Sequence, residues 1–294
     1  MTPTLVSLPS KLLQAIADHI PSEPEVRCLA QSHPQLDSIL TPYIRARKDR
    51  KERSNLLISA IQNSKPPQLC QLLLRDGADP EMRVRTEQGK TALHFAAETG
   101  QTVVARLLLL HKRSLLNIRD GIGRTPLMSA AEGGHGAVVR TLLSAQYGPA
   151  DVTLRSCRNR SVLWYAANGG NVKIVQMLLD TGYLDHNAAD NDGVTPFACA
   201  TSEGHSLRGH AEVVKLLLAT GRVQFDARDH QGMTPLMWAA KFQRTPVVEL
   251  LLSTGQLQVD FDLSELRKGP RLFGPPKLDQ SLVKLLDAYK KRDA

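Results

Sequence analysis

The stretch GRTPLMSAAEGGHGAVVRTLL, residues 123–143, decides the fold of this chain. Near its start stands a Thr-Pro pair. Two alanines follow, then a break at Gly-Gly-His, and the stretch ends in branched apolar residues. Similar stretches begin at Gly89, as GKTALHFAAETGQTVVARLLL, and at Gly232, as GMTPLMWAAKFQRTPVVELLL. A pattern that recurs in this way indicates an array of small, similar units.

The period of the array follows from aligning the copies on the hydroxyl residue near the start of the pattern. The aligned residues are Thr91, Thr125, Ser161, Thr195 and Thr234, separated by 34, 36, 34 and 39 residues. The last interval is longer because the segment GHSLRGHAEVV, residues 204–214, contains about five extra residues. We expect this insertion, 206–210, to extend a turn between two helices, where extra length costs little.

Each part of the pattern has a local structural role. The Thr or Ser accepts a backbone N–H at the start of a first helix, and the Pro that often follows needs no N–H there. The glycine nine residues after the Thr ends that helix, because it tolerates the left-handed conformation. Apolar residues at helical spacing then predict a second helix. Each unit is therefore predicted to be two short antiparallel helices and a loop.

These residues resemble the ankyrin repeat, whose pattern is T-P-L-H-x-A-A-x-x-G-H followed by x-x-V-V-x-L-L-L. The resemblance implies an all-α solenoid of stacked helix-turn-helix units with loops at the hairpin tips. A degenerate repeat stands first, at 54–86. Five full units follow between residues 87 and 262, and the first to the fifth unit below are these five. Residues 263–294 are expected to form a degenerate repeat or a capping helix, because the ends of such arrays are atypical.

The chain departs from the family pattern at several steps. The His of T-P-L-H is present only as His94, and the other four units carry Met128, Trp164, Ala198 and Met237 there. The hydrogen bonds that the resemblance implies for this His are therefore not carried over to those units. In the last unit, Gln243 replaces the usual glycine.

The first 53 residues do not join the repeat. In LVSLPSKLLQAIADHI, residues 5–20, apolar residues form a helical stripe. With the later segment CLAQSHPQLDSIL, it resembles an F-box, although Lys11 stands where that family usually has Glu. The resemblance implies binding to the Skp adaptor of cullin-RING ubiquitin ligases. The adaptor contacts it implies are Leu8, Pro9, Leu12, Leu13 and Ile16. The alternative is a helical cap on the first repeat, and both roles are compatible.

Composition and charge exclude several classes of function. The net charge is +8, of which residues 1–53 contribute +2 and residues 263–294 contribute +4, so the 209 residues between carry only +2. This near-neutral array lacks the basic stripe of a nucleic-acid-binding protein. The four cysteines lie far apart, which suits a reducing compartment and predicts no metal site. The longest apolar run, VLWYAA at residues 162–167, has six residues, so we expect no membrane span.

No constellation of nucleophile, base and stabilising group is present, so we expect no catalytic residue and no cofactor. The sequence therefore predicts a non-catalytic, monomeric, cytoplasmic or nuclear binding protein. The leading hypothesis is a substrate receptor of a ubiquitin ligase, with residues 1–53 on the adaptor and the repeats on a target protein. The alternative is an ankyrin scaffold with no ligase role, in which residues 1–53 act only as a cap.

The target-binding residues are expected at the loop tips and at the exposed end of each first helix. By register, these candidates are Lys90, Glu98, Arg124, Glu132, Arg160, Asn168, Asp192, Glu203, Met233, Lys241 and Phe242. Their mixed charge favours a protein partner. Met233 and Phe242 are apolar where solvent is expected, so both are predicted to anchor an interface. Alternatively, Phe242 folds over the degenerate C-terminal unit.

Overall fold

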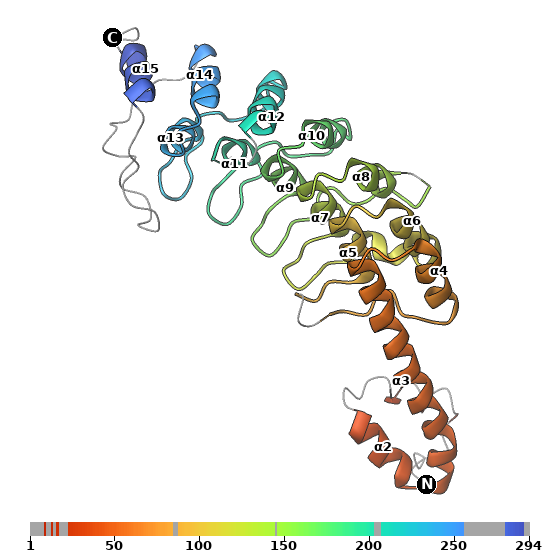
Figure 1. Cartoon of the computed structure of the whole chain (residues 1–294). Helices are drawn as coiled ribbons and strands as arrows, with labels where there is room; N and C mark the ends of the chain where they lie inside the picture. The colour runs from red at the N-terminus through yellow and green to blue at the C-terminus, as the bar shows by residue number, and fades with distance from the viewer. Residues whose placement is uncertain are drawn as a thin grey trace. The chain divides into compact units, whose positions relative to one another are not determined.

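The computed structural model describes residues 9, 13, 16, 17, 23–84, 88–144, 146–202, 207–255 and 280–290. The chain divides into two compact units, Met1–Met82 (unit 1) and Arg83–Ala294 (unit 2). The described residues form helices and loops, apart from one isolated antiparallel bridge between Val84 and Lys90 (Figure 1). The predicted all-α solenoid class is confirmed.

Unit 1 contains helices α2 (Glu23–Gln31), α3 (Pro34–Gln62) and α4 (Pro67–Arg75). α2 and α4 both pack against the long helix α3. The segment after α4 is held to α3 because the Ser54 hydroxyl accepts the Asp79 backbone N–H at 2.7 Å and Arg50 pairs with the Asp79 carboxylate at 3.1 Å.

The apolar core of unit 1 gathers residues from its N-terminal part. Its members are Leu13, Ala17, Val26, Ala30, Leu36 and Leu40. The predicted boundary after residue 53 falls inside α3, which continues to Gln62. Residues 43–62 contain neither Pro nor Gly, so nothing in their sequence ends the helix.

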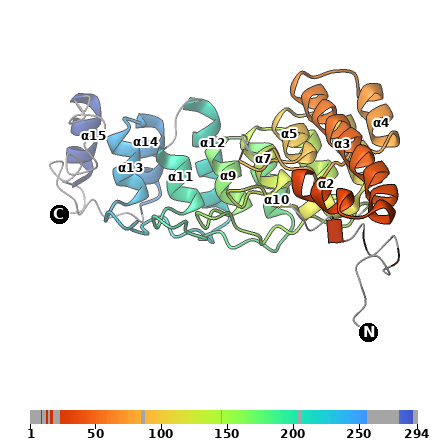
Figure 2. The same cartoon turned by 90° about the horizontal axis from the view of Figure 1, so that it is seen from below.

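Unit 2 repeats a pair of helices. The first helices are α5 (Ala92–Glu98), α7 (Pro126–Glu132), α9 (Val162–Asn168), α11 (Pro196–Ser202) and α13 (Pro235–Lys241). The second helices are α6 (Thr102–His111), α8 (Gly136–Leu143), α10 (Val172–Leu179), α12 (Leu207–Ala219) and α14 (Thr245–Ser253). A 3-10 turn, η3 (Arg113–Asn117), follows α6, and α15 (Gln280–Lys290) lies near the C-terminus. Successive first helices pack on one another, and successive second helices form a second row (Figures 1 and 2).

The predicted helix signals act as expected in unit 2. Ser161, Thr195 and Thr234 each accept the backbone N–H three residues later, at 3.1–3.2 Å. Gly134 follows α7 with a φ of +76°. Gln243 holds the equivalent left-handed conformation at a φ of +57°, without being a glycine. The turn geometry is therefore a property of the fold, which the fifth unit adopts at some cost in strain.

Histidines at the start of two second helices join neighbouring units. Nε2 of His135 lies 2.8 Å from the carbonyl oxygen of Glu98, and Nε2 of His210 lies 2.9 Å from that of Asn168. In the fourth unit, the register places the Gly-His pair of the pattern at residues 204–205, but the contact is made by His210, of the second Gly-His pair. Helix α12 begins at Leu207. The expectation that 206–210 only extends a turn is therefore corrected, because residues 207–210 add to the helix.

Candidate target-binding face

Buried carboxylates shape the loops of unit 2. Asp120, Asp190 and Asp229 are buried, and each accepts the backbone N–H groups two and four residues later, at 2.8–3.0 Å. Such side-chain-to-backbone bonds fix the turn without a regular element. They place the loop tips beside the exposed ends of the first helices, and we call these two sets of residues together the loop-side face.

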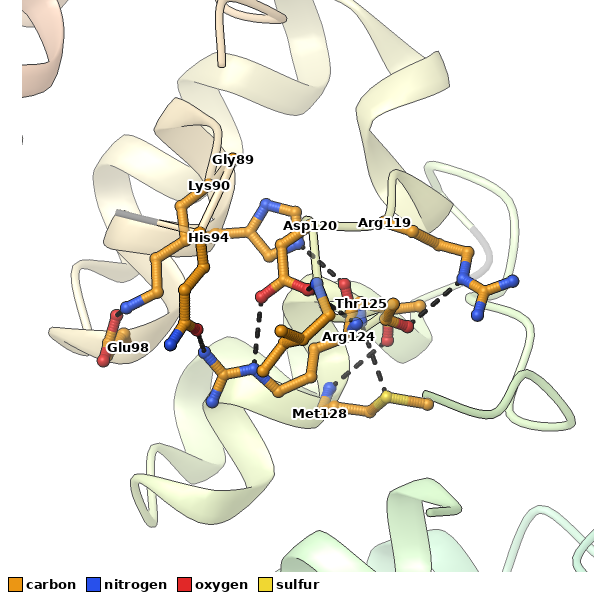
Figure 3. Close-up of polar contacts among 12 residues, drawn as sticks. Gly89, Lys90, His94, Glu98, Arg119, Asp120, Arg124, Thr125 and Met128 are labelled. Atoms are coloured by element: carbon orange, nitrogen blue, oxygen red, sulfur yellow. Dashed lines mark hydrogen bonds and ion pairs between the residues drawn. The ribbon is translucent and has the colours of Figure 1, made fainter. Parts of the chain in front are cut away.

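In the first two units of the loop-side face, the charged side chains are paired with each other (Figure 3). The Lys90 ammonium lies 2.8 Å from Glu98. The Arg124 guanidinium lies 3.1 Å from the buried Asp120 carboxylate and 3.3 Å from Glu132. Each of these charges therefore has a partner. We call this polar surface the paired region; its residues are Lys90, Glu98, Asp120, Arg124 and Glu132.

His94 is buried beneath the paired region, and Figure 3 shows its contact with Arg124 of the next unit. Nδ1 lies 2.9 Å from the Thr91 hydroxyl, and Nε2 lies 2.9 Å from the Arg124 carbonyl oxygen of the next unit. Burial lowers the pKa of His94 below its ordinary value of 6.5, and the hydrogen bond to the Arg124 carbonyl opposes that shift. The neutral ring therefore joins the first two units.

A hollow of about 370 Å³ opens in the loop-side face, lined by residues of the second to the fifth unit. The residues that line it are Glu132, Arg160, Trp164, Asn168, Asp190, Asp192, Val194, Cys199, Ser202, Trp238 and Phe242. We call this site the hollow.

The hollow exists because the fourth unit carries short side chains. Four residues after the aligned Thr, it has Cys199 where the next unit has Trp238. Seven residues after the Thr, it has Ser202 where the next unit has Lys241. Just before the Thr, Val194 replaces the Arg160 of the preceding unit. The short side chains of the fourth unit therefore leave a space between the larger side chains of the third and fifth units.

The indole rings of the hollow already face cationic groups of this chain. The Arg160 guanidinium lies 3.8 Å from the ring centroid of Trp164, and the Lys241 ammonium lies 4.8 Å from that of Trp238. Phe242 stacks on Trp238 with an interplanar angle of 9°. Desolvation lowers the pKa of Lys241, and the charge of Asp229 partly offsets that shift.

The charges that line the hollow are only partly compensated. The Asp190 carboxylate pairs with Arg160 at 3.1 Å. Glu132 accepts from Arg124 at 3.3 Å and from the Asn168 amide at 3.4 Å. The Asp192 carboxylate has no hydrogen-bond or ion-pair partner within the described part of the chain. One exposed negative charge therefore remains at this site.

The hollow brings together several of the predicted target-binding residues. Glu132, Arg160, Asn168, Asp192 and Phe242 all line it. The remaining candidates lie elsewhere: Lys90, Glu98 and Arg124 in the paired region, and Lys241 over the ring of Trp238. Glu203 lies outside the described residues. A role in binding stays a prediction for all of them.

The two apolar candidates differ in exposure. Met233 is 6% exposed, so its predicted role as a solvent-facing anchor is corrected. The Asp229 carboxylate accepts its backbone N–H at 2.9 Å, and burial of the thioether side chain removes apolar surface from water. Phe242 is 39% exposed and packs on Trp238 of its own unit, so it keeps an open face at the hollow.

Six lining residues were not among the predicted target-binding residues: Trp164, Asp190, Val194, Cys199, Ser202 and Trp238. Trp164 stands at the step where the ankyrin pattern has its His, and Trp238 stands one step later in its unit. A search for the steps at which one unit has a short side chain between units with large ones would have found the hollow.

The predicted adaptor-binding residues divide into three groups. Leu8 and Leu12 lie outside the described residues. Pro9 is exposed, and Ile16 is 36% exposed. Leu13 is 1% exposed within the core of unit 1, so it is corrected from an adaptor contact to a core residue. A side chain that packs against α2 and α3 is not available to a partner.

Two features are absent from the described residues. No helix among them has both the length and the apolar character needed to cross a bilayer. Within the same residues, no three His, Cys, Asp or Glu side chains gather closely enough to hold a metal ion.

A comparison with protein families finds ankyrin repeats in this chain. A family model described as ankyrin repeats (3 copies) matches residues 56–156, 147–208 and 206–262. Together the three matches span more than half of the chain, including every helix pair of unit 2 described above.

Proposed function

Because the chain belongs to the ankyrin repeat family, a fold for protein–protein interaction, we propose that it binds a protein target non-catalytically through its loop-side face. The hollow is the observation that carries this proposal. It combines partly exposed aromatic surface, which is enriched at the centre of protein interfaces, with an uncompensated charge, which contributes to the choice of partner. The paired region would then supply the polar rim.

The finer proposal is that the chain is a substrate receptor of a Skp-cullin-F-box ubiquitin ligase. Its support is the resemblance of residues 5–20 and 28–40 to an F-box. A second support is that Pro9 and Ile16 remain exposed while Leu13 packs in the core of unit 1. Such a division lets a small helical module be folded and still present apolar side chains to an adaptor.

Purification of the full chain from cells tests the finer proposal. We expect the Skp adaptor and a cullin to be recovered with the parent chain. Ile16→Asp should reduce this recovery, because it places a carboxylate on the apolar contact surface. Leu56→Asp is the matched control, since Leu56 is an exposed apolar residue of α3 outside the adaptor-binding set.

The alternative is an ankyrin scaffold in which residues 1–53 only cap the array. Recovery of target proteins without adaptor or cullin would support this alternative. Equal loss of adaptor with both variants would mean that the effect is not specific to the Ile16 surface.

A further inference from the structure

We propose that the hollow binds a basic side chain, Lys or Arg, from an extended segment of the target protein. This inference rests on the proposed function and specifies the chemistry of the target. It uses three observations on the hollow: its unbalanced charge, the arrangement of its aromatic rings, and a buried indole N–H that has no acceptor.

The charge of the hollow is complementary to a cation. Its lining contains three carboxylates, Glu132, Asp190 and Asp192, and one guanidinium, Arg160. Arg160 and Asp190 form a pair at 3.1 Å, and Glu132 accepts from Arg124 at 3.3 Å. Asp192 is left without a partner among the described residues, so a target cation would complete this set without displacing an existing ion pair.

The shape of the hollow suits a long aliphatic stem with a charged end. Val194 and Ser202 belong to the fourth unit, which supplies short side chains, and Phe242 is partly exposed at the fifth. Lys and Arg side chains pack their methylene groups on apolar surface while the charged end stays in a polar environment. Arg160 already lies over the ring of Trp164 and Lys241 over that of Trp238, so the partly exposed ring of Phe242 is the aromatic surface open to such a stem.

Trp164 supplies the third observation. It lines the hollow, is 6% exposed, and its Nε1 has no hydrogen-bond partner in the described part of the chain. His94 stands at the same step of its own unit and bonds to the carbonyl of the next unit at 2.9 Å. Nε1 is itself closed off from solvent, so a main-chain carbonyl of the target segment would reach it only if the side chains around Trp164 move on binding; that contact would satisfy the donor, since buried donors are normally bonded.

The two tryptophans of the chain both line the hollow, which makes a direct test possible. The full chain, labelled with ¹⁵N, is titrated with short capped alanine peptides that carry Arg, Lys, Glu or Leu at the centre. We expect the Arg and Lys peptides to shift both indole N–H resonances in a saturable way. The Glu and Leu peptides should leave both resonances in place.

Matched variants locate the binding in the hollow. Asp192→Asn should lower the affinity for the Arg peptide by about tenfold, because it removes the uncompensated charge. Asp226→Asn, at an exposed carboxylate outside the lining, should leave the affinity unchanged. Ser202→Leu should block binding by filling the hollow, whereas Ser253→Leu, at an exposed serine of α14 outside the lining, should not.

Several results would overturn the inference. Absence of any saturable shift would do so. Binding of the Leu peptide as strong as that of the Arg peptide would indicate an apolar site, and equally strong binding of the Glu peptide would indicate an anion site. Wild-type affinity in Asp192→Asn would also overturn it. These outcomes are separable from failure of the proposed function, because recovery of a target protein or of the adaptor from cells is measured independently of the peptides.

Discussion

The paired region and the hollow lie on the same face of one repeat array, and they differ in how their side chains are satisfied. In the paired region, Lys90 and Arg124 each have a carboxylate partner, and His94 is bonded at both nitrogens. In the hollow, the Asp192 carboxylate and the Trp164 indole N–H have no partner among the described residues.

This contrast separates the requirements of stability from those of binding. Both regions use the same helix pairs, the same caps and the same buried loop carboxylates. The difference arises at a few steps of the pattern, where the side chain is not needed for stacking. Unsatisfied groups at those steps cost stability and leave the surface ready for a partner.

The largest expected effect comes from His94→Phe in the paired region. The substitution leaves the Thr91 hydroxyl and the Arg124 carbonyl without their buried partner, so the free energy of unfolding should fall by about 2–3 kcal/mol. Trp164→Phe is the matched change in the hollow and should alter stability by less than about 1 kcal/mol, because it removes a donor that has no acceptor. Urea unfolding followed by circular dichroism measures both. Equal losses would remove the distinction between the two regions.

The pH dependence of stability gives a second test of His94. Its pKa is lower in the folded chain than the ordinary value of 6.5, so protons bind preferentially to the unfolded chain. Its contribution is therefore complete above about pH 6.5 and is lost as the pH falls below that value toward the folded pKa. The parent should lose more stability than His94→Phe between about pH 7.5 and pH 5 in urea unfolding. Parallel losses would contradict this assignment.

Arg160→Gln should have an intermediate effect. It removes the cation that pairs with the Asp190 carboxylate, whose side chain is 1% exposed, and it uncovers the ring of Trp164. The two backbone N–H groups that also bond Asp190 limit the loss to about 2 kcal/mol. Tryptophan fluorescence should respond as well, because Trp164 loses its neighbouring guanidinium. A stable variant with unchanged emission would show that this pair does not organise the hollow.

Gln243→Gly should stabilise the fifth unit. Gln243 has a φ of +57°, where a side chain is strained and glycine is not. The midpoint of thermal unfolding should rise, corresponding to a gain of about 1 kcal/mol. Gly134, which already has this conformation after α7, provides the reverse control: Gly134→Ala should lower the midpoint. A decrease with Gln243→Gly would show that the contacts of the Gln side chain outweigh the strain.

The smallest effect is expected at the surface ion pair of the paired region. The Glu98 side chain is 45% exposed to water and salt, and Gln at this position still offers an oxygen that can accept from the Lys90 ammonium, whose side chain is 10% exposed. Glu98→Gln should therefore change the free energy of unfolding by less than about 0.5 kcal/mol. A loss near 2 kcal/mol would mean that the paired region depends on its surface charges more than on His94.

The repeat register, the helix pairs and the helix caps could be predicted from the sequence because each rests on contacts within a few residues. The Thr or Ser caps, the glycine stops and the apolar spacing act locally. The sequence therefore shows them directly, and the structure has them at the same residues. Register also places the residues of the loop-side face, whereas their role in binding stays a prediction.

The continuity of α3, the burial of Leu13 and of Met233, and the existence of the hollow depended on the tertiary structure. Each of them is decided by what neighbouring elements bring to the same place. Leu13 is buried because α2 and α3 supply apolar partners, and the hollow forms because short side chains of the fourth unit stand between the aromatic residues of the third and fifth. Local patterns state which residues a unit presents, whereas packing between units decides which of them remain free for a partner.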